Sequence, residues 1–519
     1  MSTSLLAAET LAMLKGLRKD ITTAGLSTSS NLTFYYLEQK AKMLYPVFYP
    51  LLRTTPRENP MFGGMRVGGP GVNWKAVVSI DANGYPALSE GHRNSYMNIT
   101  TRPYFAPYKY LGKDNSTTLA AQAESRGFDD AVAIAQLSEL NALLNDEERM
   151  LLFGNSGPQS VGGNGYALGQ TALPTLAQST STSGALSAST TNYVFCVALT
   201  PWGQWQASAT GLKLPYLRTN ADGSQDQING GTGIISAVAG PVTTDSSHKA
   251  IQCTVAASVG AVSYGWFLNT AANTTSGAYF MGVTSVPSFL MTTNPVTTNQ
   301  QANATGVNST SFSTDNSYNV LDFDGIMTWA FGTYGSSQPA YLADLGGAGF
   351  TSNGDGTIAE FEAVADYLWT NYKISIDAIY LGGNLIQAAS RAVMTSSTGP
   401  GAQRLILDRS ADGKVSGGQI INQYYWKYSN TAEPKTIPVR AHPWLPQGTV
   451  LFDLYVNPYP AAGADIPAVR RIMSLEDHFA IKWPMKNLTH EIGTYCFEAL
   501  QCYIPFGYGI LTGVAPKVN

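Results

Sequence analysis

Residues 128–155 read FDDAVAIAQLSELNALLNDEERMLLFGN, the longest continuous helical pattern in a chain of 519 residues. Asp129 and Asp130 stand in the first turn, where carboxylates favour the positive end of the helix dipole. Gly154 and Asn155 follow the last apolar position, as at many helix ends. The pattern predicts a helix over about 126–153. Taken alone it is typical of a core helix in an α+β domain, and its apolar positions share one arc of a helical wheel: Ala133, Leu137, Leu140, Leu143, Leu144 and Leu151.

The composition limits what the chain can be. A length of 519 residues predicts two to four domains. Charged residues make up only 13 %, which favours a surface partly covered by other subunits. The net charge of −4 gives no field for sequence-blind nucleic-acid binding by the whole chain. No apolar run reaches the length of a membrane span, so we expect no membrane partner.

The N-terminus and the cysteines indicate a reducing compartment. The first 20 residues lack the basic start and long apolar run of a signal peptide. The four cysteines are scattered, and Cys496 and Cys502 are too far apart on a strand to bridge each other. We therefore expect free thiols.

Two segments precede the long helix. Residues 1–60 are predicted to form an extended arm, with a short helix around 33–43 and a proline-rich end. Residues 61–112 indicate a long two-stranded excursion in which VNWKAVVSI leads out and SYMNITTRPYFAPYKYLG returns. An isolated hairpin is only marginally stable in water, so this one is expected to lie on another subunit.

An all-β block follows the helix. Residues 186–292 contain strand patterns separated by Gly, Asn and Ser turns, and polar stretches such as STSTSGALSASTT flank them as linkers. The stretch VGAVSYGWFL resembles a strand pair of a fibronectin type III or immunoglobulin-like sandwich, and the block has a suitable length for one. Helices are predicted again over 320–372, then strand, turn and helix from 374, and a strand-rich end.

The residues of common catalytic and metal sites do not occur in the required patterns. TSNGDGTIAEFE has part of a calcium loop, but Thr351 at the first position cannot supply a carboxylate. No Gly-X-Ser-X-Gly elbow occurs. We therefore expect no catalytic residue, no metal, no cofactor and no enzyme, and the histidines show no metal-ligand spacing: His92, His248, His442, His478 and His490.

The order of these parts resembles the major capsid proteins of tailed bacteriophages, which run from an arm through an extended hairpin (the E-loop) and a spine helix to P- and A-domains. The matching pieces include the helix ending in EERMLLFGN, FDGIMTWAFG, IDAIYLGGNLIQAASRAV and YCFEALQCYIPFGYGI. The resemblance implies an α+β fold of that family with an inserted immunoglobulin-like or fibronectin-III-like all-β sandwich. The implied divisions are an arm (1–60), an E-loop (61–112), a P-domain with the spine (113–185), the insertion (186–292), P-domain helices and a linker (293–372), an A-domain (373–470) and closing strands (471–519).

The resemblance also implies a function. The chain would self-assemble as hexamers and pentamers into an icosahedral head enclosing double-stranded DNA, within a bacterial host cytoplasm. Its main partner would be itself, with scaffolding, portal and decoration proteins as further partners and only weak, non-specific contact to DNA. We expect Lys75, Glu90, Arg93 and Arg102 of the E-loop to form intersubunit contacts. The expected structural core of the spine consists of Ala133, Leu137, Leu140, Leu143 and Leu144.

Two further expectations follow from the family. Some members cross-link Lys to Asn between subunits, and Lys75 and Asn94 have those residue types. Because no catalytic carboxylate can be assigned to them, we expect no cross-link. Members of the family often begin with a scaffolding segment that is cleaved off, and we expect no such cleavage here. The alternative function is a secreted β-rich adhesin or glycan-binding protein, which the sandwich favours. Whether the inserted domain binds host glycans stays open: Trp202 and Trp205 would serve if they are exposed, but tryptophans in such blocks more often belong to the core. The missing signal peptide and the free cysteines oppose that alternative.

Overall fold

The structure is a computed structural model, and the predicted arm helix around 33–43 lies outside the residues it describes. The described residues are 47–59, 61–62, 65–66, 69–80, 85–94, 96, 98–126, 129–181, 183–394, 408–409, 415–416, 421–429, 434–459, 466–485 and 487–516.

The long helix is α4 (Ala131–Phe153). It begins five residues later than predicted because Asp130 caps it, with its carboxylate accepting from the N–H groups of Val132 and Ala133 at 3.0 and 3.3 Å. At the other end, the Gly154 N–H donates to the Met150 carbonyl at 2.8 Å. A Cβ atom on Gly154 would lie 2.3 Å from the Phe323 carbonyl oxygen. Glycine is therefore needed at position 154, where the segment that leads into the helix at Ile326–Gly332 comes close.

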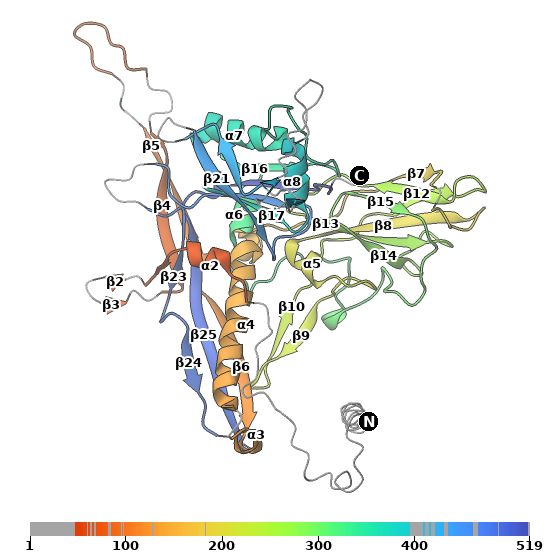
Figure 1. Cartoon of the computed structure of the whole chain (residues 1–519), viewed down its shortest axis with the longest axis horizontal. Helices are drawn as coiled ribbons and strands as arrows, with labels where there is room; N and C mark the ends of the chain where they lie inside the picture. The colour runs from red at the N-terminus through yellow and green to blue at the C-terminus, as the bar shows by residue number, and fades with distance from the viewer. Residues whose placement is uncertain are drawn as a thin grey trace.

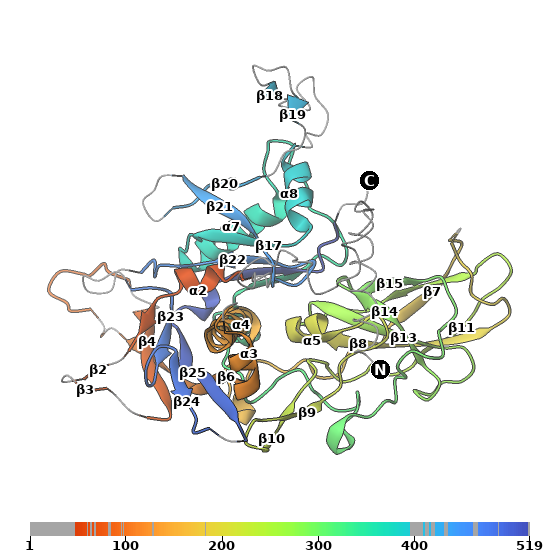
Figure 2. The same cartoon turned by 60° about the horizontal axis from the view of Figure 1, so that its bottom comes forward.

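α4 lies against a five-stranded sheet (Figure 1). Figure 2 views α4 nearly end-on, with the sheet beside it. The longest strand, β25, pairs along one edge with β6 and along the other with β24 and then β23. The strands are β1 (Arg57–Glu58), β6 (Lys109–Thr118), β23 (Val469–Met473), β24 (Phe479–Lys482) and β25 (Thr489–Cys502).

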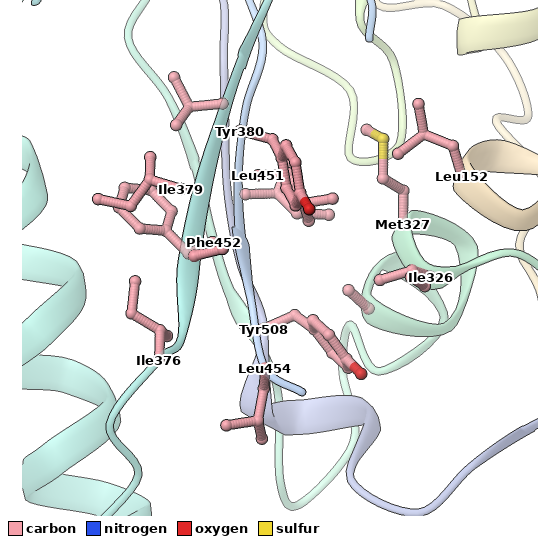
Figure 3. Close-up of a cluster of buried hydrophobic side chains, with 14 of the residues drawn as sticks. Leu152, Ile326, Met327, Ile376, Ile379, Tyr380, Leu451, Phe452, Leu454 and Tyr508 are labelled. Atoms are coloured by element: carbon pink, nitrogen blue, oxygen red, sulfur yellow. The ribbon is translucent and has the colours of Figure 1, made fainter. Parts of the chain in front are cut away.

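A second, six-stranded sheet holds the main core. Its order is β16-β26-β22-β17-β21-β20. In Figure 3, Ile379 and Phe452 point to one side of this sheet, while Tyr380 and Leu451 point to the other, toward Met327 and Leu152. The strands are β16 (Tyr341–Asp344), β17 (Ala378–Gly382), β20 (Gln423–Trp426), β21 (Lys435–His442), β22 (Val450–Asp453) and β26 (Gly509–Thr512).

The two faces of this sheet are covered by different helices. Phe361 of α7 (Ala359–Tyr372) packs edge-on against Phe452, with ring centroids 5.3 Å apart. α6 (Ile326–Gly332) and the end of α4 cover the opposite face (Figure 3). α7 lies within residues 293–372, the segment predicted to hold P-domain helices and a linker, and it packs against the six-stranded sheet through Phe361. The next helix is α8 (Leu385–Met394).

The all-β block has two main sheets, and one of them is buried on both faces. In β8, Val194, Cys196 and Ala198 face the other sheet, whereas Phe195 and Val197 join a separate core with Phe312. The first sheet runs β11 (Ala239–Thr243), β8 (Thr191–Leu199), β13 (Ser263–Asn269) and β14 (Tyr279–Thr284). The second runs β15 (Ser288–Met291), β12 (Ala250–Thr254) and β7 (Thr175–Ser179).

This block extends beyond both predicted boundaries of 186 and 292. β7 pairs with β12, although its residues lie before 186. On the other side Phe312 is fully buried in the second core. The polar composition of the segments before 186 and after 292 predicts linkers. In the structure they belong to the block, because β7 pairs with β12 and Phe312 is buried in the second core. The two ends of the block meet, since the Asn319 N–H donates to the Asn155 carbonyl and Asn155 Nδ2 donates to the Ser317 carbonyl, at 2.9 and 3.3 Å.

The block is docked on the rest of the chain by aromatic contacts. Trp205 of α5 (Pro201–Gln206) stacks on the Arg149 guanidinium of α4 at 4.2 Å, and Trp444 lies over the same group at 5.0 Å. Trp202 packs against the main core and donates from Nε1 to the Asn229 carbonyl at 3.2 Å.

The remaining elements are short apart from one hairpin. That hairpin pairs β4 (Gly71–Ile80) with β5 (Ile99–Pro107). The others are α2 (Pro50–Thr54), α3 (Leu119–Glu124), β2 (Met61–Phe62), β3 (Met65–Arg66), β9 (Tyr216–Thr219), β10 (Gln225–Ile228), β18 (Asp408–Arg409), β19 (Val415–Ser416) and 3₁₀ turns at Gln159–Val161, Val307–Ser309 and Pro505–Gly507.

Candidate functional site

Among its described residues, the β4–β5 hairpin is anchored at its base. Trp74 of β4 is 8 % exposed and stacks on Tyr104 of β5, with ring centroids 5.4 Å apart. Trp329 of α6 lies 5.8 Å from the same Trp74 ring. Beyond this cluster the described residues 85–94 project past the body of the molecule (Figure 1).

The four charged residues predicted for this hairpin are all exposed. Lys75 and Arg102 lie on β4 and β5, and Glu90 and Arg93 lie in the projecting connection. Arg102 stacks on the Tyr104 ring at 5.3 Å, and none of the four forms an ion pair within the described part of the chain. Their intersubunit role stays a prediction. Asn94 Nδ2 donates to the Tyr85 carbonyl at 2.9 Å.

An aromatic patch covers the face of the five-stranded sheet that points away from α4. Thr494 of β25 faces Glu139 of α4, so its sequence neighbour Tyr495 points the other way. Phe479 contacts both Phe497 and Tyr495, with ring centroids 5.2 and 6.0 Å apart. We call the set the aromatic face: Tyr110, Phe479, Tyr495 and Phe497, of which Tyr110 is 74 % exposed and packs edge-on against Phe497 at 4.6 Å.

The buried stripe of α4 is only partly the predicted one. Leu143 is 2 % exposed and belongs to the main core, and Leu144 packs against that core. Leu140 is half-buried. Ala133 is exposed and Leu137 is 53 % exposed, so placing these two in the core was wrong. The helix instead turns Glu139 toward the sheet, where Thr494 faces it.

The C-terminal half of α4 buries adjacent glutamates. The Glu148 carboxylate has no exposed side-chain surface and accepts from the N–H groups of Leu51 and Leu52, at 2.9 and 2.8 Å. These amides open α2, where a negative charge is stabilised by the helix dipole. Glu148 also meets His442 Nε2 of β21 at 2.9 Å. The Glu148 carboxylate of α4 thus joins α2 to β21 of the six-stranded sheet.

Glu147 serves the five-stranded sheet in the same way. Its carboxylate pairs with the fully buried Arg471 of β23 and, at 2.7 Å, with His478 Nε2. Arg471 also donates from Nη2 to the Leu52 carbonyl at 3.2 Å. A buried pair whose partner is removed leaves an uncompensated charge, so these contacts act together.

The two histidines differ in the partners of their rings. His478 has a carboxylate oxygen 2.7 Å from each ring nitrogen, from Glu147 and from Asp477. His442 presents Nε2 to Glu148, whereas its Nδ1 accepts from the Trp444 N–H at 3.3 Å.

Two further carboxyls adjoin these residues. The hydrogen bond from His478 is the main reason that the pKa of Asp477, at the exposed edge, falls to about 2, and Arg57 adds a second donor against the opposing effect of burial. Burial raises the pKa of Glu498, and Arg471, 3.8 Å away, opposes this. We call Glu147, Glu148, His442, Arg471, His478 and Glu498 the buried charge cluster, which joins α4 to β21, β23 and β25 and, through backbone groups, to α2.

Sequence reasoning missed this cluster. The histidines were tested only for metal spacing, and in the described residues no group of three or more His, Cys, Asp or Glu side chains could hold a metal ion. The available signal was the run Asp146–Arg149 in the C-terminal half of a helix that must be buried there. Among the described helices, none has the length and apolar character needed to cross a membrane. All four cysteines are free and buried.

Comparison with known proteins gives structural matches only. No protein-family model and no curated protein matches the chain. Three solved structures are similar over nearly the whole length. The SrpI encapsulin of Synechococcus elongatus has a TM-score of 0.39 at 7 % identity, covering 93 % of this chain and 94 % of its own. Gordonia phage Cozz gives 0.39 at 7 %, covering 95 % and 97 %. The capsid of a native GTA particle gives 0.40 at 8 %, covering 95 % and 100 %.

At these identities and scores, the function has to be inferred from the chain's own residues, and the immunoglobulin-like character of the insertion stays a prediction.

Proposed function

We propose that this chain is the shell-forming major capsid subunit of a tailed-bacteriophage head, assembling as hexamers and pentamers around double-stranded DNA. The observation that carries the proposal is the hairpin, which projects from the body with nothing in the described chain to cover it. Its large apolar and aromatic side chains are mostly solvent-exposed in the single chain: Val77 57 %, Tyr85 75 %, Leu88 54 %, Tyr96 93 % and Ile99 54 %. Contiguous exposed apolar surface marks a site of association.

The aromatic face supplies a surface that such a hairpin could cover on a neighbour. In Figure 1 the projecting residues 85–94 lie at one end of the molecule, and β24 with the adjoining part of β25 lies toward the other. One chain therefore cannot bring its own hairpin tip onto its own aromatic face. A contact between two different patches of identical subunits is heterologous, and such contacts give rings when the rotation between subunits closes and open filaments when it does not. Rings of this kind are what hexamers and pentamers require.

The net charge and the structural roles of the buried polar and aromatic residues support a shell-forming protein. A net charge of −4 supports only weak, non-specific contact with enclosed DNA. Glu147 and Glu148 of the buried charge cluster are held by side-chain and backbone partners of the same chain. Of the two tryptophans named as sugar contacts of the inserted domain, Trp205 stacks on Arg149 of α4 and Trp202 packs against the main core. Scaffolding, portal and decoration partners and assembly in a bacterial cytoplasm belong to this proposal.

The test compares two substitutions of equal exposure. Ile99→Ser lies on the hairpin and Val296→Ser lies beyond β15, and the parent residues are 54 and 55 % exposed. We expect expressed parent protein and Val296→Ser to form closed shells or rings in electron micrographs and to sediment as large particles. We expect Ile99→Ser, alone or with Tyr96→Ser, to remain largely as folded free subunits.

A parent chain that stays monomeric over a wide concentration range would refute the proposal. Equal particle yields from the Ile99→Ser and Val296→Ser variants would remove the hairpin from the interface.

A further inference from the structure

Two of the four cysteines lie in one core of the all-β block, on different sheets. Cys196 lies on β8 of one sheet and Cys253 on β12 of the other, and both are fully buried. Their side chains belong to the same core cluster between the sheets. Cys496 and Cys502 lie on β25, in a different part of the molecule.

The strand register places each cysteine beside one member of an aromatic stack between the sheets. Cys196 is the direct cross-strand neighbour of Trp266 on β13. Cys253 is the direct cross-strand neighbour of Phe289 on β15. The Trp266 and Phe289 rings stack across the gap between the sheets, with centroids 6.1 Å apart. Since neighbours within a sheet have Cβ atoms only about 5 Å apart, both cysteines lie next to this stack, and Cys253 is near enough to contribute to the raised pKa of Cys196.

From this juxtaposition we propose that Cys196 and Cys253 are a latent disulfide site that closes between the two sheets under oxidising conditions. The oxidant would be a low-molecular-weight disulfide such as oxidised glutathione. One cysteine thiolate attacks it, one glutathione thiolate leaves, and the second cysteine displaces the other glutathione from the mixed disulfide. Overall two thiols lose two electrons and two protons, and the reagent becomes two thiols.

Burial sets when this reaction can occur. Burial raises the pKa of Cys253 to about 12 and that of Cys196 well above its usual value. Both thiols are therefore protonated and shielded in the closed block, and reaction requires the block to open locally. The bond is expected to form slowly at low temperature and faster as the opening frequency rises.

The experiment uses the full chain, reduced and then incubated with oxidised glutathione at several temperatures below global unfolding. After acid quenching and denaturation, a mass-tagging maleimide counts the remaining thiols, and peptide mapping locates any bond. We expect two of the four thiols to be lost, with Cys196 and Cys253 in one linked peptide. The oxidised protein should unfold at a temperature at least about 4 °C higher, reversibly with dithiothreitol.

Matched variants sharpen the result. Cys496→Ser should still lose two thiols, whereas Cys253→Ser should lose none to an internal bond. Retention of all four thiols after incubation at temperatures that open the block would overturn the proposal. So would stable glutathione adducts at the two positions, or linkage to Cys496 or Cys502. The mapping of the parent chain decides the matter even if a variant does not fold.

Discussion

The C-terminal half of α4 buries charged side chains, whereas the β4–β5 hairpin exposes apolar ones. The helix buries Glu147 and Glu148 among partners from both sheets, while the hairpin leaves Tyr96 93 % exposed. Residues of the first region are needed for the single chain to fold. Those of the second are largely dispensable for folding and, under the proposed function, are needed for association. Variants of the two regions should therefore separate stability from assembly.

Removing the central cation of the buried charge cluster should have the largest effect. Arg471→Met leaves Glu147 buried without its guanidinium partner and brings no compensating positive charge. We expect a loss of about 3–5 kcal/mol in the free energy of unfolding, measured by denaturant titration of unassembled subunits. The control is Arg218→Met, which breaks the exposed pair with Asp226 and should change stability by less than about 1 kcal/mol. Similar losses in the two variants would contradict the structural role of the cluster.

The next largest loss of stability is expected in α4, and its size should depend on where along the helix the substituted leucine lies. Leu143→Ala opens a cavity in the main core and should cost about 2–5 kcal/mol. Leu137→Ala removes a side chain that is 53 % exposed and should change the unfolding free energy by about 0.5 kcal/mol or less. Thermal melting of the two variants checks this. If Leu137→Ala assembles poorly although it folds well, its exposed face is an interface in the particle.

Two aspartates should give opposite pH dependences of stability. Burial raises the pKa of Asp453 to about 7, so the folded state keeps a proton that the unfolded state releases from about pH 4. The stability penalty therefore grows as pH rises from about 4 to 7 and is complete above 7. Asp453→Asn removes it, and we expect a gain of about 1–3 kcal/mol at pH 8 that disappears near pH 4.

Asp477 behaves in the opposite sense. Its pKa is lowered to about 2, so its contribution is present above about pH 4 and is lost as pH falls toward 2. Asp477→Asn should therefore destabilise the subunit at pH 6 and have little effect at pH 2. Unfolding midpoints measured across pH 2–8 test both residues, and parallel curves for the two variants would show that these assignments are wrong.

The smallest effect on stability is expected in the hairpin. Glu90→Lys and Arg93→Glu change exposed residues without ion-pair partners in the described chain, so the unfolding free energy should move by about 0.5 kcal/mol or less. Particle yield should nevertheless fall, as light scattering and electron microscopy would record. Asp222→Lys on the exposed turn between β9 and β10 is the control and should assemble normally. Normal yield from both hairpin variants would leave their predicted intersubunit role without support.

The helices and strands could be predicted from the sequence better than the side chains that pack against them. Apolar periodicity identified α4, but its buried face depends on partners such as His442 and Arg471, almost 300 or more positions away. A helical wheel cannot register such partners, so a buried glutamate looks like solvated surface. The ends of the all-β block were misplaced for a related reason. Serine- and threonine-rich segments resemble linkers until a residue such as Phe312 is seen to fill a core.

The meeting of the two ends of the all-β block at Asn155 has an engineering consequence. Residues 156–318 leave and rejoin the rest of the chain within hydrogen-bond distance. Foreign proteins with adjacent termini could therefore be grafted between Asn155 and Asn319 with short connectors, without pulling α4 and α6 apart. The graft would have to supply a new cover for Arg149, which loses Trp205 in the exchange. If the subunit builds particles, each would display as many grafted copies as it has subunits.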